Sequence, residues 1–251
     1  MTTIRRLTFS IALAAALSAT AWAQPATIRS VRAYTVKPDR VGDFQAAIKE
    51  YNAILVKAGA SVSYNMWHSL TGPNEYVRVD NFSTWAGLDS NPLTSDPKLK
   101  DQVANLRVIA DRINACVESS RRAIEEVIPE LSLGSPGVTS RMIRVLQTTV
   151  KPDKTEEFLD LYRKEVLPAV KKAAPNFYSV AQVRYGSASS EFVSVISLDH
   201  WAELDGGFGV QKVMGKEGYA KFLAKITPLL VGSHYEIYSF MPDLSYIPAA
   251  K

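Results

Sequence analysis

The stretch TVKPDRVGDF (Thr35 to Phe44) recurs almost unchanged as TVKPDKTEEF (Thr149 to Phe158). In both copies strand-forming residues precede a Lys-Pro pair, and an amphipathic pattern follows it. Proline suits the first turn of a helix, where its missing N–H would have no intrahelical partner. The repeated phrase therefore predicts a junction from a strand into a helix, used twice in one chain.

The residues after the first junction have helical spacing. Val41, Phe44, Ile48 and Tyr51 are three or four positions apart, which places them on one apolar face, and Gly59 is a suitable helix end. In the second copy Pro168 falls inside the matching pattern, so we expect a kink there.

Two strands joined by a turn follow each helix. They are predicted at 60–70 and 75–82 in the first copy, and at 176–185 and 191–198 in the second. A second amphipathic helix and a last strand complete each copy, which ends on the phrase VIPELS or FMPDLS. Each copy thus reads β-α-β-β-α-β, the ferredoxin-like unit.

A ferredoxin-like sheet carries helices on one face and must cover the other, because a bare apolar sheet face is unstable in water. Two copies solve this by packing sheet to sheet. We therefore predict an α+β fold of two tandem ferredoxin-like repeats, closed as a pseudo-dimeric α/β barrel within one chain. The predicted divisions are a first repeat at 24–132, a linker at 133–139 and a second repeat at 140–251.

Residues 1–23 form a predicted signal peptide. Arg5 and Arg6 precede a short apolar run that ends in Ala-Trp-Ala before Gln24. The run is short for a membrane anchor. We expect cleavage after Ala23, a periplasmic or secreted protein, and no stable membrane span after cleavage.

Charge and cysteine content limit the possible partners. Of 29 basic and 25 acidic residues, only Arg5 and Arg6 fall in the predicted signal peptide, which leaves 27 against 25. The two signs are interspersed, which argues against a nucleic-acid partner. Cys116 is the only cysteine, so no internal disulfide forms, and its place on an apolar helical stripe indicates a core residue. Association into a homo-oligomer remains open.

The segments SVRAYTVKPD (Ser30 to Asp39) and, more loosely, IRVLQTTVKPD (Ile143 to Asp153) carry a family resemblance. They resemble NIPSNAP-type members of the dimeric α/β-barrel superfamily, which also contains antibiotic-biosynthesis monooxygenases and haem-binding branches. The resemblance implies the fold over nearly the whole mature chain. The Asn, Trp and helical His shared by haem-degrading relatives have no match here, so no cofactor is implied.

The space between the sheets is the natural ligand site of such a barrel. We place Leu70 opposite Glu75 across the first hairpin. On this register, the first-half residues predicted to face the lumen are Tyr34, Asn65, Trp67, Arg78 and Asp80. A slip of one residue would exchange the faces and bring His68 inward.

In the second half, small apolar residues such as Val183 and Val193 are assigned to the face under the helices. The residues predicted to face the lumen are Gln182, Arg184 and Phe192.

These candidates support two interpretations. Arg78 and Asp80 could bind a polar group while Trp67, Tyr34 and Phe192 stack on a flat molecule. Alternatively, Arg78 and Asp80 form a structural salt bridge, as buried ion pairs often do.

Other motifs are weaker. Trp85 and Trp201 recur at matching places and are interpreted as packing anchors. His200 and His234 stand near glutamates, but with three histidines in the chain no metal site is predicted. Serine-nucleophile, phosphate-loop and dinucleotide motifs are absent from the sequence.

Three functional hypotheses remain. The first is a protein that binds a small aromatic or amphipathic molecule in the lumen. The second is a cofactor-independent monooxygenase or isomerase. The third is a structural or interaction protein with a filled barrel.

Overall fold

The computed structural model describes residues 28–134, 140–188 and 190–248. The predicted signal peptide and most of the predicted linker lie outside these ranges. The first half contains β1 (Ile28–Val36), α1 (Val41–Ala58), β2 (Asn65–Ser69), β3 (Glu75–Phe82), α2 (Pro92–Ser95), α3 (Val103–Ala115) and β4 (Val117–Val127). The second half contains β5 (Met142–Val150), α4 (Thr155–Leu161), α5 (Leu167–Ala173), β6 (Tyr178–Tyr185), β7 (Glu191–Leu198), α6 (Gly209–Ile226) and β8 (Leu230–Phe240).

The eight strands form one closed barrel in the order β1-β3-β2-β8-β5-β7-β6-β4. Each half contributes four adjacent strands, and the halves are joined by the antiparallel pairs β2–β8 and β4–β6. Closure leaves no free sheet edge, which removes a site of unwanted strand pairing. The predicted tandem ferredoxin-like barrel is confirmed.

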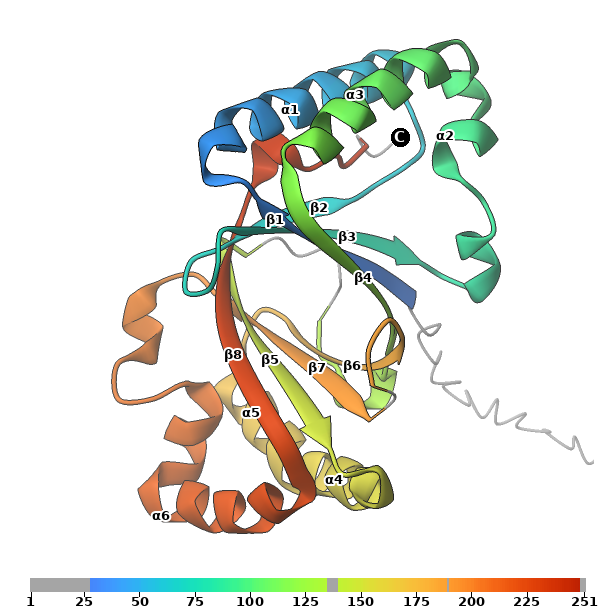
Figure 1. Ribbon diagram of the computed structural model, residues 1–251. Coiled ribbons are helices and arrows are strands. Elements are labelled where there is room, and N and C mark those ends of the chain that lie inside the picture. Colours follow the sequence, from blue (N-terminus) through green and yellow to red (C-terminus); the bar gives the residue numbers. More distant parts are fainter. Residues whose placement is uncertain (1–27, 135–139, 189, 249–251) are drawn as a thin grey trace, which may run out of the picture.

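The helices lie outside the barrel. In Figure 1, α1 and α3 cover the outer face of the first sheet, and α4, α5 and α6 lie on the outer side of the second. Each half has its own helix–sheet core, centred on Phe44 in the first and Phe158 in the second, both fully buried. A third cluster, with Trp67 and Val193, lies between the sheets.

The last segment of each half, VIPELS at 127–132 and FMPDLS at 240–245, packs into the core of the other half; we call these segments the exit phrases. Leu131, at the end of the first half, is buried in the second-half core, whereas Leu244 and Tyr246, at the end of the second half, are buried in the first-half core. A serine at the same position of each exit phrase forms a hydrogen bond to the other half. Ser245 Oγ accepts a hydrogen bond from Met66 N (2.8 Å), and Ser132 Oγ accepts one from Val180 N (3.1 Å). The two halves therefore complete each other's cores.

The predicted register of the first hairpin is wrong by one residue. Trp67 pairs with Val77, and His68 pairs with Tyr76. Leu70 leaves this ladder and donates its N–H to Ile237 of β8 at 2.8 Å. The turn is thus set by contact with the other half, which the hairpin sequence does not contain. Because the side-chain period of a strand is two, the slip turns the whole of β3 over.

The faces of the second hairpin are assigned the wrong way round. Val183, Val193 and Val195 belong to the cluster between the sheets, whereas Phe192 packs on Phe158 of α4 with ring centroids 5.0 Å apart. The aromatic ring fits the deep helix–sheet core, and the branched aliphatic side chains line the space between the two sheets.

Two further expectations have different outcomes. The helix around Pro168 is interrupted by a π-helical turn at 162–166, which lets α5 begin anew with the proline in its first turn. Trp85 and Trp201 are 40% and 50% exposed, so they are not buried packing anchors. No helix in the described part of the chain is long and apolar enough to cross a membrane.

Candidate functional site

The lumen of the barrel contains a cavity of about 310 Å³. Its walls are largely aliphatic and come from both halves, for example Val31 and Val79 from the first and Val145 and Val195 from the second. Asn65 and Trp67 line it, as the sequence predicts. Their role in binding a ligand stays a prediction.

Arg78 and Asp80 do not line the lumen. They lie on the helix-covered face, because β3 is turned over relative to the predicted register. Arg78 Nη2 is 2.7 Å from Asp80 Oδ1, and the guanidinium stacks 3.8 Å above the ring of Tyr64. Burial opposes the charged form of Arg78, but Asp80 more than offsets this and raises the pKa of the guanidinium. This geometry supports the structural salt bridge.

Tyr34 also faces the helices of the first half and packs against Phe44, with ring centroids 5.9 Å apart. In the second half Phe192 is a core residue, and Gln182 lies opposite it on the same face. Arg184 is exposed, with Nε 2.7 Å from Glu126 Oε2. These four residues are therefore outside the lumen.

A charged pair that the sequence did not single out faces the lumen. Arg29 Nη2 lies 3.2 Å from Glu125 Oε2, and both residues are buried, with 8% and 5% exposure. Burial raises the pKa of Glu125, Arg29 lowers it in part, and Glu191 adds to the increase. Among the described residues, Arg29 Nε and the hydroxyl of Ser179 have no polar partner, and Arg29 Nη2 has only its ion-pair contact with Glu125. All three atoms belong to residues that line the cavity.

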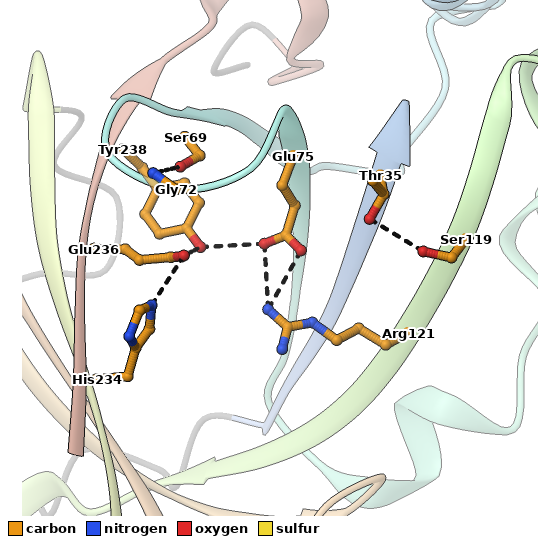
Figure 2. Close-up of polar contacts among 9 residues, drawn as sticks. All are labelled: Thr35, Ser69, Gly72, Glu75, Ser119, Arg121, His234, Glu236 and Tyr238. Atoms are coloured by element: carbon orange, nitrogen blue, oxygen red, sulfur yellow. Dashed lines mark hydrogen bonds and ion pairs between the residues drawn. The ribbon is translucent and has the colours of Figure 1, made fainter. Parts of the chain in front are cut away.

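A polar network lies at the other end of β1 and β3, where the two halves meet (Figure 2). Arg121 Nη2 contacts both carboxylate oxygens of Glu75, at 3.2 and 3.4 Å, and His234 Nε2 is 3.1 Å from Glu236 Oε1. The hydroxyl of Tyr238 reaches Glu75 Oε1 at 3.2 Å and donates to Glu236 Oε2. The two carboxylates are buried, while the side chains of Arg121 and His234 are mostly exposed.

The polar groups of this network bond to one another. Burial, followed by the contacts with Glu236 and Glu75, raises the pKa of Tyr238, so its phenol keeps its proton. The turn after β2 packs tightly over it, because a Cβ at Gly72 would overlap Glu236 Oε1. Each buried carboxylate thus has a donor from its own half or from the other one, as buried charges require. We interpret this network as a seam between the halves.

A second cavity of about 300 Å³ lies between the second sheet and α6. Its lining is aromatic and aliphatic, with Phe208, Tyr219 and Phe222 on the helical side. Val231 and Tyr235, at 69% and 44% exposure, mark the side that is open to solvent. α6 itself changes direction at Gly215, whose φ of 68° favours glycine. We call this cavity the α6 pocket.

Of the described residues that line the α6 pocket, Arg144 of β5 is the one with a charged side chain. Its guanidinium lies between two rings, 4.0 Å from the centroid of Phe208 and 4.2 Å from that of Tyr235. Within the described residues it makes no hydrogen bond or ion pair. A guanidinium has five N–H donors in its plane. The two rings contact the flat faces of the Arg144 guanidinium, so its N–H donors remain available to a ligand.

Two hydroxyl groups lie deeper in the same pocket. Tyr162 Oη and Ser194 Oγ are 3.4 Å apart. Burial raises the pKa of Tyr162 to about 12, although the hydrogen bond with Ser194 lowers it in part. Tyr162 therefore remains a neutral phenol at physiological pH.

Sequence reasoning missed the α6 pocket, although one signal was present. Arg144 stands in a strand whose neighbours on the same face, Leu146, Thr148 and Val150, are all uncharged. At the equivalent position of the first copy, five residues before the repeated threonine, stands Ser30. A charge that appears in only one copy of a repeat, on its core-facing side, marks a position that packing does not explain.

The described residues contain no group of three or more His, Cys, Asp or Glu side chains placed to hold a metal ion. His234 and Glu236 do lie together, but as part of the seam network.

Comparisons with known proteins bear on the fold. No protein-family model matches the sequence, and no curated protein matches it significantly. A protein from Lactobacillus acidophilus NCFM, named provisionally as a monooxygenase, has a similar structure, with 10% identity and a TM-score of 0.57 over 90% of this chain and 98% of that one. A provisionally named monooxygenase from Fusobacterium nucleatum shares 11% identity, with a TM-score of 0.57 over 86% of this chain and 92% of that one.

A structure described as an anthrone oxidase-like protein is similar as well, with 14% identity and a TM-score of 0.56 over 90% of this chain and 97% of that one. These identities are low, so the likeness defines the fold alone. The protein is a single-chain member of the dimeric α/β-barrel fold class, with both repeats in one polypeptide. The structure therefore confirms the resemblance at the level of fold.

Proposed function

We propose that the protein binds a small, flat, negatively charged molecule in the α6 pocket, with Arg144 holding its carboxylate. The observation that carries this proposal is a guanidinium stacked between two aromatic rings, with no acidic partner among the described residues, inside a cavity of about 300 Å³. Ligand pockets are typically mostly apolar cavities of this size or larger with a few placed polar groups.

The chemistry of the ligand follows from the lining. Phe208, Tyr219 and Phe222 offer aromatic surface on which a ring can pack. Arginine matches a carboxylate with two parallel hydrogen bonds. An aromatic or amphipathic carboxylate satisfies both features. The sequence-based hypothesis of such a ligand is thus retained, but its site moves from the lumen to the outer face of the second sheet.

Binding is favoured over acid–base catalysis for one reason. Among the described residues that line the α6 pocket there is no Asp, Glu, His or Lys. A general base needs a group that loses a proton near neutral pH. The buried Tyr162, with its raised pKa, does not supply one.

A cofactor-independent oxidation is the second candidate, supported by the protonated Tyr162 beside Ser194. In such a reaction a ring CH₂ is oxidised to C=O by O₂, and the second oxygen atom leaves as water. The substrate would itself have to be acidic enough to lose its proton without a protein base, and Tyr162 would donate a hydrogen bond to the developing ring oxyanion. Oxygen consumption during turnover of an added anthrone separates this candidate from binding alone.

The test of binding uses 1-naphthoate and its neutral analogue 1-naphthalenemethanol in calorimetric titrations. Arg144→Met should weaken 1-naphthoate binding by about 10- to 100-fold, because a hydrogen bond to a charged group contributes about 1.5–3 kcal/mol. The neutral analogue should bind both proteins equally. Arg141→Met, a change at an exposed arginine just before β5, is the matched control. Equal 1-naphthoate affinity of the wild type and Arg144→Met would refute the proposal.

We further propose that binding takes place outside the cytoplasm, on the basis of the predicted signal peptide. Intact-mass analysis of the protein isolated from its host should give a chain that begins at Gln24. A chain that still contains residues 1–23 would contradict export by this route.

A further inference from the structure

The lumen has polar atoms that the fold itself leaves without hydrogen bonds. Arg29 is 8% exposed; its Nη2 lies 3.2 Å from Glu125 Oε2, but its Nε has no polar partner among the described residues, and Ser179, 2% exposed, has an unpartnered hydroxyl. Buried polar groups in native proteins are nearly always hydrogen-bonded. An unmade hydrogen bond of this kind costs about 1–3 kcal/mol.

The two ends of the lumen differ in this respect. At the end near Thr35 and Glu75, the seam network gives each buried carboxylate a donor (Figure 2). Arg29 lies six residues away along β1, about 20 Å at the usual rise of a strand. There Arg29 lines the largely apolar cavity of about 310 Å³, with Glu125 as its one ion-pair partner within the described ranges. The unfilled hydrogen bonds therefore lie at the Arg29 end.

From this we infer that the lumen is a second binding site, for an uncharged apolar molecule carrying a carbonyl or hydroxyl oxygen. The oxygen accepts hydrogen bonds from Arg29, and the apolar body lies against the valines of both sheets. Ser179 offers a further hydrogen bond within the same cavity.

Charge balance excludes a carboxylate as the preferred ligand here. Arg29 is already paired with Glu125, and Glu191 also lines the cavity. Arg121 and Arg122 line the cavity too, but Arg121 is paired with Glu75, and Arg122 Nε donates to Ser30 Oγ. A carboxylate ligand would therefore add a third negative charge, beside Glu125 and Glu191, to a site of low polarity whose guanidinium groups already have partners. The lumen and the α6 pocket thus select opposite ligands, although both place arginine in the lining of a largely apolar cavity.

The test uses octan-2-one and octanoate as probes of the same chain length. Binding is followed by the NMR signal of the Trp67 indole N–H, assigned with the variant Trp67→Phe, because Trp67 lines the lumen and not the α6 pocket. We expect octan-2-one to shift this signal saturably, and octanoate to bind at least tenfold more weakly. No shift of the Trp67 signal with octan-2-one, or equal affinity for octanoate, would overturn the inference.

The decisive variant is the double substitution Arg29→Met/Glu125→Gln, which removes the donors without leaving a buried carboxylate unpaired. It should weaken octan-2-one binding about tenfold, the loss expected for one hydrogen bond to a charged group. Arg32→Met is the matched control, because Arg32 lies on the same strand, points away from the lumen and is itself exposed. Arg144→Met should also leave the Trp67 response unchanged.

If the double variant does not fold, as judged by circular dichroism, Ser179→Ala decides the question. This substitution removes one hydroxyl from a position where it has no protein partner, so the fold should tolerate it. A two- to fivefold loss of octan-2-one affinity supports the lumen site. Unchanged affinity would contradict the assigned role of this hydroxyl and, without a folded double variant, the inference itself.

Discussion

The helix-covered faces of the two sheets carry opposite chemistry at equivalent positions. In the first half Arg32, on the central strand, pairs with Arg78 on one side and Arg122 on the other. The matching row in the second half, in the same order, is Leu146, Ser194 and Tyr235. One sheet thus places three guanidinium-bearing residues side by side, where its copy places one aliphatic and two hydroxyl-bearing side chains.

This difference decides where a cavity forms. Like charges directly opposite each other on neighbouring strands are destabilising, and in the first half Asp80 offsets part of that cost by pairing with Arg78. The stacked Tyr64 and the ion pair occupy the space beneath α1. In the second half no such pair is needed, and the corresponding region belongs to the lining of the α6 pocket. The two halves thus share the same strand pairing but differ in the side chains on the helix-covered face.

The largest expected effect tests how far the halves depend on each other. Leu244→Ala should reduce the free energy of unfolding by about 3 kcal/mol, as for other buried leucines, because this second-half residue fills the first-half core. Urea denaturation measures the change. Ile247→Ala, at a 56% exposed position three residues later, is the control and should change little. A loss below 1 kcal/mol would show that the exit phrase is dispensable.

A smaller effect tests the ion pair of the first half. Asp80→Asn should cost about 2 kcal/mol, less than the 3–5 kcal/mol of a fully buried pair, because the two side chains are 25% and 20% exposed. Asp43→Asn, which breaks an exposed pair with Arg40, should cost about 0.5 kcal/mol or less. If both variants lose the same stability, the Arg78–Asp80 pair has no special structural role.

The smallest effect concerns pH and the second half. The folded state keeps the proton of Tyr162 up to a pKa of about 12, whereas an unfolded tyrosine loses it near 10. Between these values the folded state binds more protons than the unfolded state, so stability falls as pH rises, by about 1.4 kcal/mol per pH unit. Denaturation at pH 10 to 11 should show a shallower decline for Tyr162→Phe than for the wild type. Parallel declines would contradict a raised pKa.

Much of the fold was predictable because its elements follow from short local patterns that occur in both copies of the repeat. The Lys-Pro junctions and the order of elements appear in both copies, and the structure has them, as it has the helical stripe closed by Gly59 in the first copy. The candidate site was less predictable. Of eight predicted residues only Asn65 and Trp67 line the lumen. The slip in the first hairpin turned Arg78 and Asp80 outward, the exchanged face of the second did the same for Gln182, Arg184 and Phe192, and Tyr34 of β1 was assigned to the wrong face of its strand.

The sequence by itself determined the repeat, the ferredoxin-like order and the need to cover two sheet faces, since these follow from periodicity and turn chemistry within short stretches. The tertiary structure alone decided the strand register, the exchange of exit phrases and the cavities beside Arg29 and Arg144. Strand pairing fixes which face a side chain takes, and here that pairing depends on contacts between halves more than 150 residues apart, such as Leu70 with Ile237.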